Sequence, residues 1–385
     1  MRPESSAVAN LLLTAACAVS FQQPLVNEHL TDKTVGSANT ISWPLFSSLE
    51  RTARLADITY CVGTTGVSKP FSCISRCSEF PSLNLVASWN TGVLMSDSCG
   101  YIAVDHAVRR PDAPEGGEVG KRAIIIAFRG TYSITNTVVD LSTIPQEYVP
   151  YPAPDDSGGD PKAPKHTCSN CTVHMGFLAS WRSARSSVMP VLQTLKRDHG
   201  DYPIWLIGHS LGGAVAALAA LEFKVSLGWD NIKVTTFGEP RIGNQGLADF
   251  VNEVFELNGE NHAEERTYRR VTHMDDPVPL LPLTEWGFRP HAGEIFIAKS
   301  DLSPEPDDVR VCIGDSDERC IAGSESKDNR STSWWSRVSH IPGRMKLWQL
   351  FFAHRDYFWR LGLCVPGGDP RNWGREYEGA PSEKL

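Results

Sequence analysis

A serine stands between glycines where an apolar run meets an alanine-rich run. The sequence GHSLG at residues 208–212 places Ser210 after the apolar residues 205–207 and before the alanine- and leucine-rich residues 213–221. This pattern predicts a strand, a tight turn and a helix. Small flanking residues let the two elements pack closely and leave the hydroxyl at a helix N-terminus, which favours developing negative charge. The chemistry indicated is nucleophilic attack by Ser210, whereas the other interpretation is a glycine-rich turn with a solvent-facing serine.

A nucleophilic serine needs a histidine to accept its proton and a carboxylate to orient that histidine. Where such a serine turn is used for catalysis, the chain order is serine, then Asp or Glu, then histidine. Asp276 follows a predicted strand at residues 269–273, so a loop can hold its carboxylate at the end of the sheet. The Pro-Val-Pro sequence at 277–279 fixes the backbone there, which favours Asp276 over its neighbour Asp275. An ordinary polar turn is the alternative.

Eleven histidines compete for the role of the base. His209 adjoins Ser210, but consecutive side chains on a tight turn point apart, so we expect His209 to be packed or hydrogen-bonded beneath the turn. His354 lies late in the chain, in an apolar and aromatic segment, and satisfies the order. His340, on a more polar stretch, is the alternative. A lone histidine in an aromatic segment is usually a core residue, so position alone does not decide.

Ester chemistry also needs two backbone N–H groups that stabilise the oxyanion. The residue after the nucleophile, Leu211, supplies one, and a loop after an early strand supplies the other. Thr131 follows the predicted strand at 122–128 and is placed for the second, with a hydroxyl that can add a hydrogen bond. The alternative is a simple turn residue at the end of a strand.

The elements that must position these groups alternate between strands and helices. Further strands are predicted at residues 85–89, 100–105 and 233–237, and helices at 46–60 and 174–195. The strand at 122–128 contains an unbroken apolar run, as expected of a strand covered on both faces. We find no repeat and no second core, which favours one α/β domain with a mostly parallel sheet.

Two later segments have a different character. Residues 294–298, EIFIA, are expected to form an edge strand, and residues 303–333 are charged and polar, which predicts an insertion. Asn329 lies in this insertion and is a candidate glycosylation site.

The composition narrows the class of protein. Hydrophobic residues make up 41% of the 385 residues, enough for a sizeable core, while the formal charge of −8 argues against a nucleic-acid partner. Residues 1–20 carry an apolar stretch that is too short to span a membrane and ends in an acceptable cleavage site. We therefore expect a signal peptide at 1–20, an α/β domain at 21–367, a polar tail at 368–385 and an extracellular location. The alternative at the N-terminus is a helix that is not cleaved.

The ten cysteines are consistent with secretion. Close pairs that look like disulfide-clipped loops are Cys73–Cys77, Cys168–Cys171 and Cys312–Cys320. Cys61 and Cys364 are left to join the two ends of the domain, and Cys99 is expected to be a buried free thiol. Cys168 and Cys171 have the spacing of half a metal site, but no second half follows, so we predict no metal.

A series of motifs in this chain, spanning roughly residues 61–364, resembles the class 3 lipases, a family that includes filamentous-fungal triacylglycerol lipases and a feruloyl esterase. The motifs are FRGT at 128–131, CSNC at 168–171, HMGF at 174–177, GHSLG at 208–212, FGEPRIGN at 237–244, DPVP at 276–279 and AHRDYF at 353–358.

The resemblance implies an α/β-hydrolase fold with no metal or organic cofactor. It also implies a triad of Ser210, Asp276 and His354, an oxyanion hole at Thr131 and Leu211, and disulfides Cys61–Cys364, Cys73–Cys77 and Cys168–Cys171. The resemblance further implies that His174 and Arg129 support the structure and are not catalytic residues.

In such lipases the segment after the oxyanion loop is an amphipathic lid that opens at a lipid surface. The corresponding residues 132–141 lack the tryptophan common in the lipases. The side chains expected to form this lid are Tyr132, Ile134, Val138, Val139 and Leu141.

The sequence therefore predicts a secreted carboxylic-ester hydrolase, most simply a triacylglycerol lipase working on lipid or ester substrates at a lipid–water interface. The alternatives are a feruloyl or other soluble-ester esterase, a phospholipase, or a non-catalytic lipid-binding relative. The oligomeric state stays open.

Overall fold

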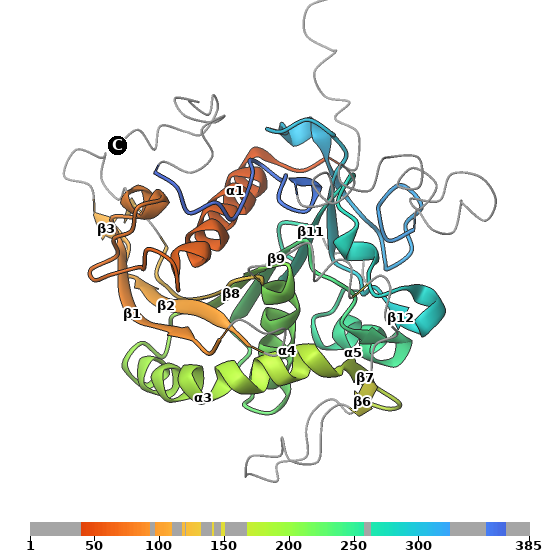
Figure 1. Ribbon diagram of the computed structural model, residues 1–385, viewed down its shortest axis with the longest axis horizontal. Coiled ribbons are helices and arrows are strands. Elements are labelled where there is room, and N and C mark those ends of the chain that lie inside the picture. Colours follow the sequence, from red (N-terminus) through yellow and green to blue (C-terminus); the bar gives the residue numbers. More distant parts are fainter. Residues whose placement is uncertain are drawn as a thin grey trace, which may run out of the picture. The chain divides into compact units, whose positions relative to one another are not determined.

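A central sheet of eight strands forms the frame of the computed structural model of this chain (Figure 1). The structure describes residues 40–92, 97–109, 118–119, 121–131, 141, 148–150, 168–257, 263–323 and 352–366. Across the sheet, the strands are β1 (Leu83–Asn90), β2 (Cys99–Asp105), β5 (Ala123–Phe128), β8 (Ile204–His209), β9 (Ile232–Phe237), β11 (Tyr268–His273), β13 (Glu294–Ile297) and β14 (Val309–Val311). Each neighbouring pair of strands from β5 to β13 is parallel. The pairs β1–β2, β2–β5 and β13–β14 are antiparallel.

Two smaller sheets and four α-helices accompany the central sheet in the described residues. The second sheet has the order β12 (Phe288–Arg289), β10 (Gly243–Asn244), β7 (Thr172–His174), β6 (Tyr148–Pro150), and β3 (Val108–Arg109) pairs with β4 (Glu118–Val119). The helices are α1 (Trp43–Ile58), α3 (Met175–Asp198), α4 (Leu211–Val225) and α5 (Gln245–Val254).

Helices cover both faces of the central sheet (Figure 1). Alternate side chains of a strand point to opposite faces. In β5, Ile124 and Ile126 therefore join the core formed with α3 and α4, whereas Ile125 joins the core formed with α1. The apolar run of this strand is buried throughout, as its composition predicts.

One expectation about the later segments is wrong. The strand near Glu294, β13, is not at the edge of the sheet, because β14 pairs with it on its outer side. The described part of the expected insertion, residues 303–323, supplies that outer strand through Val309–Val311. The polar residue that suggested an exposed face, Glu294, is fully buried.

All four expected disulfides are present, and Cys99 is a buried free thiol. Other expectations lie outside the described residues. These are the signal peptide at 1–20, the tail at 368–385, His340, Asn329, and the lid residues Tyr132, Ile134, Val138 and Val139. The remaining lid residue, Leu141, is fully buried in the core shared with α3 and α4.

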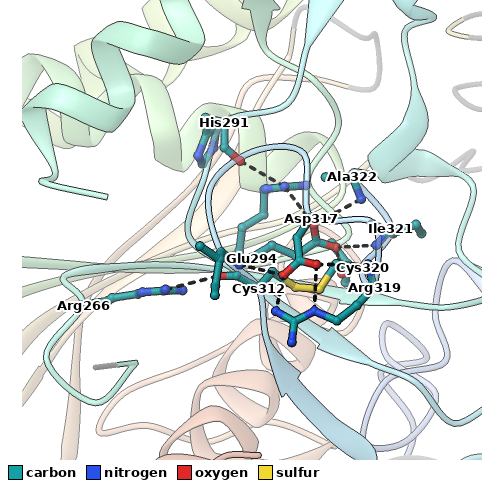
Figure 2. Close-up of a disulfide and its surroundings, with 12 residues drawn as sticks. Arg266, His291, Glu294, Cys312, Asp317, Arg319, Cys320, Ile321 and Ala322 are labelled. Carbon is teal, nitrogen blue, oxygen red and sulfur yellow. Dashed lines mark hydrogen bonds and ion pairs between the residues drawn. A yellow bond between two sulfur atoms is a disulfide. The ribbon is translucent and has the colours of Figure 1, made fainter. Parts of the chain in front are cut away.

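The loop closed by the disulfide Cys312–Cys320 helps to bury the Glu294 carboxylate (Figure 2). Just beyond this loop, the backbone N–H groups of Ile321 and Ala322 each donate to a Glu294 oxygen at 3.2 Å. Thr272 Oγ1 donates to the same carboxylate at 2.5 Å, and Arg270 Nη2 donates at 3.4 Å. The charge is therefore matched by four donors, which is the condition for burying a carboxylate without a large cost.

Replacement of Glu294 by alanine tests this assignment. It would leave the buried Arg270 guanidinium without its opposite charge, although Nη2 keeps its hydrogen bond to the His291 carbonyl oxygen, and it would leave the two backbone donors without their acceptor. We therefore expect a loss of about 3–5 kcal/mol in the free energy of unfolding in urea. The matched control is Glu265→Ala, because Glu265 is exposed, and it should change this free energy by less than about 0.5 kcal/mol. Equal effects of the two substitutions would contradict the assignment.

His174 begins helix α3. Its Nδ1 accepts a hydrogen bond from the Phe177 backbone N–H at 3.3 Å, and its ring stacks on the Phe177 ring at 4.0 Å. Burial lowers the pKa of His174 from 6.5 to about 4. Below pH 6.5 the unfolded chain therefore takes up a proton that the folded protein does not accept until the pH approaches 4. The free energy of unfolding accordingly falls as the pH falls through this interval.

His174→Asn retains a side-chain acceptor at the helix N-terminus and removes the titration. Between pH 6.5 and about 4, its free energy of unfolding should fall by about 2–3 kcal/mol less than that of the parent protein. Other groups, such as Asp57, whose pKa burial raises to about 6, titrate in both proteins and cancel. Denaturant titrations at several pH values measure the difference, and parallel curves would contradict the role of His174.

Candidate active site

Ser210 occupies the tight turn that joins β8 to α4. Its backbone has φ 60° and ψ −133°, a region that is costly for a residue with a side chain. The flanking glycines explain how the turn is accommodated. A Cβ atom on Gly208 would lie 2.2 Å from the Gly212 carbonyl oxygen, and one on Gly212 would lie 2.4 Å from the Phe128 carbonyl oxygen. Both positions therefore require glycine, as the sequence pattern predicts.

The carboxyl ends of four parallel strands meet around this turn. The Ser210 N–H donates to the carbonyl oxygen of Phe237, the last residue of β9, at 2.9 Å. A Cβ on Gly130, just after β5, would lie 2.8 Å from Ser210 Cβ. Asp276 follows β11 by three residues. Because the strands run parallel, groups from distant parts of the chain reach one edge of the sheet.

Asp276 and His354 form a buried pair at this edge. His354 Nδ1 lies 2.9 Å from both Asp276 carboxylate oxygens, and neither side chain is exposed. The carboxylate also accepts hydrogen bonds from the Val278 backbone N–H at 2.9 Å and from the Tyr357 hydroxyl at 2.5 Å. Burial and the Asp276 charge raise the pKa of Tyr357 well above its usual value, so the phenol stays protonated and donates. The carboxylate therefore holds the imidazole ring in one orientation.

The alternative acid, Asp275, points elsewhere. It is exposed, and its carboxylate accepts a hydrogen bond from the Ser300 hydroxyl at 2.5 Å. Of the two neighbouring aspartates, only Asp276 contacts His354 in the described residues.

His209 lies beneath the turn. Its Nε2 is 2.8 Å from the backbone carbonyl oxygen of His354, and its Nδ1 is 2.5 Å from the Tyr60 hydroxyl. A carbonyl oxygen can only accept, so Nε2 carries the proton and Nδ1 accepts from Tyr60. Burial, assisted by the neighbouring His354, lowers the pKa of His209 well below 6.5, which keeps the ring neutral. His209 thus holds the His354 backbone, and its ring stacks on the His354 ring at 4.7 Å.

Two polar atoms at the centre of the site remain unused. Within the described part of the chain, Ser210 Oγ and His354 Nε2 are buried and have no hydrogen-bond partner. Ser210 is 1% exposed and His354 is 0% exposed, so the site is closed to solvent in this structure. A hydroxyl and an imidazole nitrogen that meet no other group are free to bond to each other and to a reacting ester.

Backbone donors lie next to Ser210. Leu211 is the first residue of α4, and the first N–H groups of a helix have no partner within the helix. Thr131 follows Gly130, whose backbone packs directly against Ser210. Arg129 supports this turn, because its Nη1 donates to the Val62 carbonyl oxygen at 2.6 Å and its Nε donates to the Gly130 carbonyl oxygen at 3.1 Å.

Three residues that shape the site have no role predicted from the sequence. Tyr357 lies three residues after His354, so a polar group at that spacing was a usable signal. Gly238 is the second residue of the FGEPRIGN motif, directly before Glu239, and its backbone has φ +59°. Tyr60 lies 149 residues before His209, and no local pattern connects them.

The described residues contain no group of three or more His, Cys, Asp or Glu side chains arranged to hold a metal ion. Among the helices described, none combines the length and apolar character that a membrane span requires.

The fold and the serine turn define an α/β-hydrolase, and comparisons with known proteins define the family. The family described as lipase (class 3) matches residues 125–286. Secreted mono- and diacylglycerol lipase 2 of Gibberella zeae is 56% identical over 384 residues, covering 96% of this chain and 94% of that protein. Lipase A of Sodiomyces alcalophilus is 57% identical over 99% of this chain and 96% of that protein. Lip2 lipase from Yarrowia lipolytica matches in structure with a TM-score of 0.68 and 30% identity, over 85% of this chain and 97% of that chain.

The chain belongs to the class 3 lipase family. It is a secreted serine ester hydrolase, and the expected family and α/β-hydrolase fold are both confirmed.

Gly238 offers a test of how tightly the site is packed. A Cβ at this position would lie 2.7 Å from His354 Cε1 and 2.8 Å from Asp276 Oδ2. Gly238→Ala should therefore displace the pair and lower kcat on a soluble ester about 100-fold, since small misplacements have such effects.

The matched control is Gly228→Ala. Gly228 also has a positive φ, +66°, but no atom of the described residues lies within 4 Å of the added Cβ. Both variants should lose about 1 kcal/mol of stability from backbone strain, and only Gly238→Ala should lose activity. Equal activities would show that the Asp276–His354 pair is not confined as described.

Proposed function

We propose that Ser210, His354 and Asp276 act as a catalytic triad for ester hydrolysis. Ser210 Oγ attacks the ester carbonyl while His354 Nε2 accepts the hydroxyl proton and passes it to the leaving alcohol. Water, activated by the same nitrogen, then releases the acid from the acyl-enzyme. The observation that supports this most is the fully buried Asp276–His354 pair at 2.9 Å, whose second imidazole nitrogen has no other partner in the described residues.

We also propose the backbone N–H groups of Leu211 and Thr131 as the oxyanion hole. The position of Leu211 at the start of α4 adds the favourable end of the helix dipole. The packing of Gly130 against Ser210 supports the placement of Thr131 on the other side of the same carbonyl. Removing one such donor costs about 2.7–4 kcal/mol of transition-state stabilisation in comparable hydrolases.

Entry of a lipid requires the site to open. Ser210 is 1% exposed, so an ester carbonyl has no path to its hydroxyl without movement of the residues that cover it. We infer that opening takes place at a lipid–water interface, with the segment at 132–141 as the lid. Leu141 anchors the chain at the end of this segment, because it is fully buried in the core.

The substrates that we propose are acylglycerols, with mono- and diacylglycerols preferred. This preference rests on the name of the Gibberella zeae relative, a mono- and diacylglycerol lipase that is 56% identical over nearly the whole chain. Triacylglycerol, which the motifs alone favoured, is the competing substrate.

Asp276→Asn tests the triad. It should lower kcat about 10⁴-fold, because an amide holds the wrong tautomer of His354. The control is Asp275→Asn, one residue away, which should stay within about twofold of the parent, because Asp275 contacts Ser300 and not His354. Initial rates on p-nitrophenyl butyrate measure both. A larger loss of kcat in the Asp275 variant would indicate that Asp275, and not Asp276, orients His354.

Emulsified monoolein, diolein and triolein, compared at equal interfacial area, test the substrate class. We expect diolein and monoolein to be hydrolysed at least about tenfold faster than triolein, a difference of about 1.4 kcal/mol in the barrier. Ser210→Ala provides the background. If triolein is hydrolysed as fast as diolein, the preference for mono- and diacylglycerols is contradicted and the lipase assignment is retained. If only soluble esters are hydrolysed, the lipase assignment is contradicted.

A further inference from the structure

A cavity lies at the amino ends of the parallel strands, opposite the ends that carry the candidate active site. This cavity of about 190 Å³ is lined by the beginnings of β8, β9 and β11, through residues such as Trp205, Lys233 and Arg269, and by Leu45 and Ser48 of α1. Ser210 and Asp276 follow the other ends of these strands. The cavity is therefore separate from the candidate active site.

The cavity is positively charged, although the whole chain carries a net charge of −8. Among the residues that the structure describes, four cationic ones line it, Lys121, Lys233, Arg266 and Arg269, against one acidic residue, Glu264. Glu264 is exposed and hydrogen-bonded to Ser42, the N-cap residue of α1. Partial burial of the ammonium group, together with the nearby charges of Arg269 and Lys121, lowers the pKa of Lys233.

Arg266 supplies buried donors at this site. It is 7% exposed, and its Nη2 donates to the Cys312 carbonyl oxygen at 3.2 Å, next to the disulfide Cys312–Cys320 (Figure 2). In the part of the chain that the structure describes, its Nε and Nη1 have no acceptor. The indole Nε1 of Trp205, which also lines the cavity, lacks one as well. Buried donors without acceptors are uncommon in folded proteins, because each costs free energy.

We propose that this cavity is a binding site for a small oxyanion, a phosphate or a short carboxylate, held by Arg266 and Trp205 within and by Lys121 and Lys233 nearer the solvent. Arginine binds both groups through charge-assisted N–H bonds, and the Nε and Nη1 of Arg266 that lack acceptors in the described residues are the donors for them. The volume accommodates several water-sized groups, which is enough for an anionic head but not for a long acyl chain.

Isothermal titration calorimetry of the full-length protein tests the site by measuring anion binding. Inorganic phosphate and sodium butyrate are titrated separately at constant ionic strength, with sodium chloride as the blank. We expect saturable binding of at least one of them, weakened about tenfold by Arg266→Gln and about threefold by Lys233→Gln, since charge-assisted hydrogen bonds are the strong ones. The control is Arg197→Gln, because Arg197 is exposed on α3, outside the cavity, and this variant should bind like the parent.

The outcomes separate the possible sources of the anion. Tighter binding of phosphate indicates free phosphate or a phosphate ester, and tighter binding of butyrate indicates carboxylates such as the acids that ester hydrolysis releases. Lys233 is exposed, so its variant keeps the test valid if Arg266→Gln does not fold. No saturable binding of either anion, or equal binding by the parent, Lys233→Gln and Arg197→Gln, would overturn the proposal.

Discussion

The geometry of the candidate active site depends on the buried carboxylate of Asp276. It accepts hydrogen bonds from its own loop, through Val278, and from two residues near the C-terminus, His354 and Tyr357. A buried charge is tolerated only when it is matched in this way, so the carboxylate draws the C-terminal segment onto the end of β11. The orientation of the imidazole is a consequence of satisfying that charge.

Other contacts hold the segment around His354, residues 352–366, against α1. The disulfide Cys61–Cys364 joins it to the 3₁₀ turn at Thr59–Cys61, directly after α1, and the Gly362 N–H donates to the Asp57 carboxylate in the last turn of α1 at 2.5 Å. His209 binds the His354 carbonyl oxygen from below. These contacts link residues that are 145–305 positions apart in the sequence. The site therefore forms only when the whole domain has folded.

Much of this arrangement could be predicted from the sequence, because its signals are local. The turn at Ser210 needs glycine on both sides, and the strand at Ala123–Phe128 is apolar throughout, so short patterns identify both. The strand that begins at Glu294 was expected at an exposed edge, and that was wrong because β14 pairs with it on its outer side. The donors that neutralise the Glu294 carboxylate come from residues 270, 272, 321 and 322, which no local pattern connects. The contact between Tyr60 and His209 and the cationic cavity at Arg266 are equally non-local. Pairings of this kind become visible only in three dimensions.

The most direct test of the account is covalent labelling with a fluorophosphonate, followed by mass-spectrometric mapping of the modified peptide. Such a reagent reacts with a serine that a neighbouring histidine activates. The account predicts a single label on Ser210 in the folded parent protein, absent in Ser210→Ala and at least about 100-fold slower in His354→Gln. A label on another serine, or labelling at the parent rate in the folded His354→Gln variant, would contradict it.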